Sequence, residues 1–91
     1  MSITVVFDAP GMTAVQYDEV MAELSQAGAG MPDGRLYHVA SPTDSGWYVL
    51  DVWESEEKLD TFARTLMPML AGVGVQPPQP VVMPTHNIVS G

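Results

Sequence analysis

The chain has 91 residues, enough for one domain (1–91), and its eleven acidic residues outnumber its three Lys and Arg to give a net charge of −8. This charge argues against nucleic acid and anionic membranes as partners, because both require clustered cations. The chain has no cysteine, which excludes disulfides and thiol chemistry and favours a cytoplasmic location. Because 46% of the residues are hydrophobic and no crosslink is available, oligomerisation is the expected way to enlarge the core.

The first part of the chain predicts a strand followed by a helix. The run from Ile3 to Asp8 is β-branched and is closed by the turn pair Pro10-Gly11. Thr13 and Gln16 have the spacing of a capping box at the start of a helix. The apolar face of that helix contains Tyr17, Val20, Met21 and Leu24.

A loop rich in Gly and Pro leads to two strands that the sequence predicts as a hairpin. They are Arg35 to Ser41 and Trp47 to Trp53, joined by a loop at residues 42–46. Apolar residues occur at both alternating sets of positions in the second of these strands, so neither of its faces is polar throughout. A strand with one solvated face shows apolar residues on one side, so both faces are expected to be buried.

The remainder predicts a helix and a last strand. Ser55 is placed to cap the helix, with Glu56 and Glu57 in its first turn. Its apolar stripe consists of Leu59, Phe62, Ala63, Leu66 and Leu70. Pro68 should kink the helix or end it nearby. Residues 81–89 are predicted to be extended, and Pro84 requires either an edge strand or a bulge there.

The predicted order is therefore βαββαβ, a ferredoxin-like α+β domain with two helices on one face of a four-stranded antiparallel sheet. The other sheet face is left bare by this arrangement. Since both faces of residues 47–53 are apolar, we expect the bare face to pack on the same face of a second subunit. The predicted assembly is a homodimer.

The arrangement resembles the antibiotic-biosynthesis-monooxygenase-like group of dimeric α/β-barrel proteins. The strand-to-helix junction VWES (Val52 to Ser55) and the segment LMPML (Leu66 to Leu70) carry the resemblance, which extends over nearly the whole chain. It implies two sheets facing each other as a barrel, with a pocket between the helices and the sheet of each subunit. Some members oxidise polycyclic or quinol substrates without metal or flavin, and others degrade haem or act as isomerases or cyclases.

The sequence favours the members that use no cofactor. The haem-degrading members place an Asn on the first strand and a Trp and a His near the second helix. Here the first strand has no Asn and the second helix carries Phe62 and no His. The chain also lacks a phosphate-binding glycine motif and a cluster of metal ligands. No metal, haem or flavin is therefore expected.

The candidate catalytic residues are His38, His86 and Tyr48. If the hairpin pairs Ala40 with Tyr48, then His38 and Tyr48 share the apolar face under the helices, and His86 on the last strand could join them. A neutral imidazole beside a phenol in a dry pocket suits proton abstraction, the step that prepares a substrate for oxygenation without a cofactor. Both histidines also fit structural roles, His38 in or near the core and His86 at the surface or an interface.

The same register places Arg35, Tyr37, Asp51 and Trp53 on the barrel-facing side, and Val49 in the dimer interface. Asp51 would need a partner there, because a buried unpaired carboxylate is costly. Arg35 is the expected partner in a structural ion pair. A shift of one residue in the hairpin would exchange these faces.

Two functions follow from these observations. The first is a small-molecule enzyme, a cofactor-independent monooxygenase or a related isomerase or cyclase, that acts on an aromatic or polyketide-like compound. The second is a non-catalytic dimeric module that binds an apolar ligand or has a structural role. A pocket of a few hundred cubic ångströms between helices and sheet would favour the enzyme, and a closed layer would favour the module.

Overall fold

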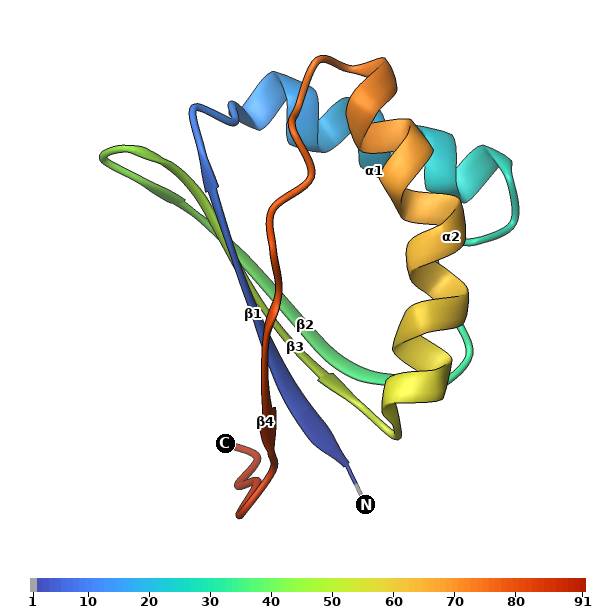
Figure 1. Ribbon diagram of the computed structural model, residues 1–91, viewed down its shortest axis with the longest axis vertical. Helices are drawn as coiled ribbons and strands as arrows, with labels where there is room; N and C mark the ends of the chain where they lie inside the picture. The colour runs from blue at the N-terminus through green and yellow to red at the C-terminus, as the bar shows by residue number, and fades with distance from the viewer. Residues whose placement is uncertain (1) are drawn as a thin grey trace.

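The computed structural model describes residues 2–91, and its elements follow the predicted order: β1 (Ile3–Pro10), α1 (Ala14–Gln26), β2 (Arg35–Thr43), β3 (Gly46–Trp53), α2 (Glu56–Gly72) and β4 (Val81–Pro84). The strands form one antiparallel sheet in the order β2-β3-β1-β4. Both helices cover the same face of this sheet (Figure 1). The predicted ferredoxin-like α+β fold is confirmed.

Both helices begin at the predicted caps. Thr13 and Gln16 form a reciprocal capping box, in which each side chain accepts the backbone N–H of the other residue. The Ser55 hydroxyl accepts the N–H of Lys58 at the start of α2. Pro68 does not end α2, which continues to Gly72.

The core lies between the helices and one face of the sheet. Its most deeply buried side chains come from three elements: Val5 of β1, Val20 and Leu24 of α1, and Trp53 of β3. In β1, the buried residues Val5, Phe7 and Ala9 alternate with more exposed ones. This period of two is what a sheet covered on one side requires.

The β2–β3 hairpin differs from the prediction by one residue. Thr43 pairs with Gly46, so the strands continue up to a two-residue turn at Asp44 and Ser45. As a consequence, Ala40 pairs with Val49, and the predicted pairing of Ala40 with Tyr48 is wrong. Because side chains alternate along a strand, this shift places every residue of β3 on the face opposite to the one predicted.

The other face of the sheet carries apolar side chains that remain partly exposed. Val39 of β2 is 57% exposed, Tyr48 of β3 is 39% exposed, and Val81 of β4 is 57% exposed. We refer to this side, which neither helix covers, as the open face (Figure 1). The segment after β4 reaches this face, where Ser90 and the Tyr37 hydroxyl form a hydrogen bond of 2.7 Å.

The last strand is shorter than predicted. β4 ends at Pro84 and pairs with Ile3 to Val6 of β1 at the edge of the sheet, which is one of the two arrangements that Pro84 allows. Residues 85–91 follow it without regular structure.

Among residues 2–91, neither helix is long and apolar enough to cross a membrane.

Candidate functional site

A cavity of about 60 Å³ lies between the helices and the covered face of the sheet. Its apolar walls come from both helices, β1 and β3, and Pro78 closes one side from the segment before β4. Four residues bring polar groups to these walls: Tyr17, Arg35, His38 and Asp51. The cavity therefore combines an apolar lining with a small set of polar groups, as ligand sites usually do.

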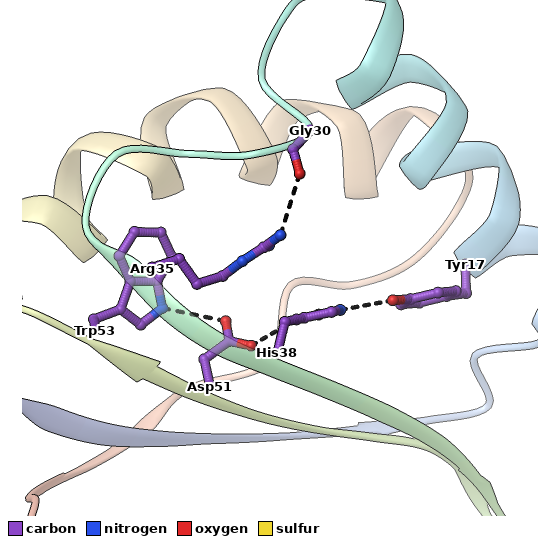
Figure 2. A network of polar contacts seen from close by, with 6 residues as sticks. All are labelled: Tyr17, Gly30, Arg35, His38, Asp51 and Trp53. Atoms are coloured by element: carbon purple, nitrogen blue, oxygen red, sulfur yellow. Dashed lines mark hydrogen bonds and ion pairs between the residues drawn. The ribbon is translucent and has the colours of Figure 1, made fainter. Parts of the chain in front are cut away.

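Three of these residues and Trp53 form a continuous chain of hydrogen bonds (Figure 2). The indole N–H of Trp53 donates to Oδ2 of Asp51 at 3.2 Å, and Oδ1 of Asp51 lies 2.6 Å from Nδ1 of His38. Nε2 of His38 lies 2.6 Å from the Tyr17 hydroxyl. Because a carboxylate accepts hydrogen bonds, Nδ1 of His38 carries the proton and Nε2 can accept one from Tyr17.

The register of the sheet brings the hydrogen-bonded residues together. His38 of β2 and Asp51 of β3 are directly paired residues, so their side chains leave the sheet side by side on the covered face. Asp51 is 4% exposed, and both of its oxygens are engaged by donors. A buried carboxylate needs such partners, since leaving it without them is costly.

Tyr17 reaches the site from the first turns of α1. Its ring stacks on Trp47 with a centroid distance of 5.0 Å, which holds the hydroxyl against Nε2 of His38. Burial raises the pKa of the Tyr17 phenol above its ordinary value of 10.0. The Arg35 guanidinium opposes this rise, whereas the charges of Asp51 and Asp18 add to it. Tyr17 therefore holds its proton at neutral pH and can donate it to His38.

A β-bulge brings Arg35 to the same face. Arg35 pairs with Trp53 and Tyr37 pairs with Val52, so Leu36 is an extra residue in β2. Without this extra residue, side chains three positions apart in a strand would point to opposite sides, and Arg35 would face away from His38. The guanidinium instead lies 5.9 Å from the centre of the Phe62 ring.

The structure separates the three predicted catalytic residues. His38 lies under the helices, on the expected face, and lines the cavity. Tyr48 lies on the open face, because the hairpin register is shifted by one residue. His86 is exposed and follows the end of β4, and it does not line the cavity. The predicted grouping of these residues around one pocket is therefore wrong.

Three of the four residues predicted to face the barrel lie on the covered face of the sheet instead. Arg35, Asp51 and Trp53 belong to the covered face, and Tyr37 alone of that group is on the open face. Asp51 pairs with His38, and the part of the chain described by the structure contains no ion pair between Asp51 and Arg35. Val49 lines the cavity, so its predicted place in the dimer interface is wrong as well.

Sequence reasoning placed Tyr17 in the apolar stripe of a helix and gave it no chemical role. Its hydroxyl was the available signal, because a buried tyrosine oxygen usually has a hydrogen-bond partner. Asp51 was recognised as a carboxylate in need of a partner, but the wrong register gave Arg35 as that partner in place of His38.

Within residues 2–91, no three His, Cys, Asp or Glu side chains are grouped so that they could hold a metal ion.

Comparisons with solved structures identify the fold that contains this site. Neither a family model nor a curated protein sequence matches the chain. Among solved structures, a candidate antibiotic biosynthesis monooxygenase from Chloroflexus aurantiacus J-10-fl has a TM-score of 0.69 and 15% identity, with 99% of this chain and 98% of that chain covered. The chain has the fold of the antibiotic biosynthesis monooxygenases.

Two further structures have this fold and a described activity. SnoaB of Streptomyces nogalater, a cofactor-independent oxygenase, has a TM-score of 0.63 and 10% identity, covering 99% of this chain and 96% of its own. A monooxygenase from the gene ActVA-Orf6 of Streptomyces coelicolor, in complex with nanaomycin D, has a TM-score of 0.59 and 20% identity, covering 99% and 91%. At these identities the likeness establishes the fold, and the function must be argued from the site.

Proposed function

We propose that the protein is a small-molecule enzyme, a cofactor-independent monooxygenase that acts on an aromatic or polyketide-like compound. The observation that carries the proposal is the hydrogen-bonded chain Tyr17–His38–Asp51 at the wall of an apolar cavity. In this hydrogen-bonded series His38 is the base, and Asp51 orients it and stabilises the imidazolium. Tyr17 transfers the proton from the substrate to His38. The structural likeness to cofactor-independent oxygenases supports the assignment.

The proposed reaction requires molecular oxygen and no other oxidant. An acidic methylene carbon of the substrate loses a proton, which reaches His38 through Tyr17. The carbanion is then oxidised by O₂: one oxygen atom becomes the carbonyl oxygen of the product, and the other leaves as water with the two hydrogens of the methylene. The four electrons that O₂ gains are those that the carbon loses in going from methylene to carbonyl. The protein supplies the base and an apolar cavity for the substrate.

The test is oxygen uptake with 1,8-dihydroxyanthrone as the substrate, measured for the wild type and for His38→Gln. We expect the substitution to lower turnover about 10²–10⁴-fold, since it removes a general base. His86→Gln, the same change in the exposed histidine, should leave turnover unaltered. Wild-type uptake no faster than that of the anthrone alone would reject an oxygenase for this substrate class, and full activity of His38→Gln would reject the base.

One observation favours the second function, a non-catalytic module that binds an apolar ligand. The cavity of about 60 Å³ is smaller than the few hundred cubic ångströms that ligand pockets usually provide. A substrate with several rings would need side chains such as Met12 and Met21 to move, which flexible methionines allow. Binding of the anthrone without oxygen uptake would select the module over the enzyme.

For either function we propose a homodimer formed through the open face. The fold resemblance implies this arrangement, and the exposed apolar side chains of three strands support it. In the dimer the open faces of the two sheets would pack together, and each subunit would keep its own cavity on the other side of the sheet.

A further inference from the structure

We propose that Arg35 binds the negatively charged oxygen that forms on the substrate when His38 removes a proton. This assigns the substrate class more narrowly: a phenol or enol whose oxygen is conjugated to the acidic carbon, so that the charge reaches that oxygen. The inference rests on the proposed function, because it concerns the anion made by the proposed base.

The placement of Arg35 is the first argument. The bulge at Leu36 turns Arg35 to the covered face, where it lines the same cavity as Tyr17, His38 and Asp51. Figure 2 shows its side chain on the same side of the strand as His38 and Asp51, extending towards Gly30. Bulges of this kind occur next to active sites, where they redirect a side chain.

The remaining hydrogen-bonding capacity of the guanidinium is the second argument. A guanidinium has five N–H donors in a planar fork that matches oxygen anions. Within the described residues 2–91, its recorded hydrogen bond is from an Nη to the Gly30 carbonyl, at 3.2 Å. Contact with the Phe62 ring holds the group in place without using a donor. Donors therefore remain for a ligand in the cavity.

The balance of charge is the third argument. Proton transfer creates two charges in an apolar cavity, an imidazolium on His38 and an anion on the substrate. Separated charges are costly in such surroundings unless each has an opposite partner. Asp51 already faces His38 at 2.6 Å. Among the cavity-lining residues in the described part of the chain, Arg35 is the one cation, so it is the available partner for the substrate oxygen.

The experiment compares a phenolate with an uncharged molecule of similar shape. Binding of 4-nitrophenol, at a pH where it is ionised, and of nitrobenzene is measured by titration calorimetry on the full chain. We expect Arg35→Met to weaken phenolate binding at least tenfold and to change nitrobenzene binding by less than about threefold, because one charge-assisted contact is lost. Arg64→Met, at an exposed position of α2, is the matched control and should change neither affinity.

The inference is overturned if the wild type does not prefer the phenolate, or if Arg35→Met weakens both ligands equally. Should Arg35→Met fail to fold, Arg35→Gln gives the same comparison, because glutamine is also uncharged, and unchanged phenolate selectivity in that variant would also contradict the inference. Oxygen uptake separates the two proposals. Loss of uptake in His38→Gln together with unaltered phenolate binding in Arg35→Met would reject the role of Arg35 and retain the base. The reverse pattern would retain an anion site and reject the base.

Discussion

The two faces of the sheet are built from alternating residues of the same strands, yet they differ in solvent exposure and in hydrogen bonding. On the covered face, Asp51 is 4% exposed and is tied to His38 and Trp53. On the open face, Val39 and Tyr48 remain in contact with solvent. Burial favours pairing of polar groups, and the paired network of Asp51, His38 and Tyr17 can be used for proton transfer. In the described part of the chain, the indole N–H of Trp47 is the buried side-chain group on this face that has no partner. The open face has exposed apolar area, which favours association instead.

The largest expected difference between the faces comes from adding a charge to β1. Val5 is fully buried under the helices, whereas Val6, its neighbour, is on the open side and partly exposed. Val5→Asp should cost more than about 4 kcal/mol of unfolding free energy, because it buries a charge without a partner. Urea unfolding followed by far-UV circular dichroism measures this cost. Val6→Asp is the matched variant, and equal losses for the two would contradict the assignment of the faces.

The buried network is tested by removing its acceptor. Asp51→Leu leaves the N–H of His38 and the indole N–H of Trp53 without an acceptor, so it should lower the unfolding free energy by about 2–5 kcal/mol. Asp18→Leu, the same change at an exposed position of α1, should alter it by less than about 0.5 kcal/mol. Denaturant midpoints of the two variants make the comparison. A similar small loss for both would show that Asp51 is not important for stability.

The role of the open face is tested by a charge at Val39. The wild type should be a dimer at micromolar concentration by light scattering, and Val39→Asp should raise the dissociation constant at least 100-fold, since two-fold symmetry brings two like charges into the interface. Its circular dichroism should stay that of the wild type. Val15→Asp, a change at an exposed position of α1, should remain dimeric. A monomeric wild type would refute the barrel dimer.

The smallest expected effect concerns the Tyr17 hydroxyl. Burial raises its pKa in the folded state above 10.0, so above about pH 10 the unfolded chain releases this proton while the folded chain keeps it. The unfolding free energy should therefore fall as pH rises towards the folded pKa, and Tyr17→Phe should remove this part of the decline. In an ultraviolet titration, comparison of the wild type with Tyr17→Phe isolates the ionisation of Tyr17, which should occur above its ordinary pKa of 10.0. Ionisation of Tyr17 at or below pH 10 would contradict its burial.

The sequence by itself determined the order of the elements, both helix caps and the fold. These features depend on local chemistry and periodicity: Thr13 and Gln16 can cap a helix only at their spacing, and the apolar stripe of residues 59–70 fits one helical face. His38 was found because it is one of two side chains in the chain that ordinarily titrate near neutral pH.

Only the tertiary structure decided which residues surround His38. The two-residue turn and the bulge at Leu36 each shift the hairpin by one position, and a shift of one position exchanges the faces of a strand. Asp51 and Arg35 thereby join His38, and Tyr48 leaves it. Tyr17 joins from α1 through contacts between residues distant in the sequence, and no spacing along the chain encodes such contacts.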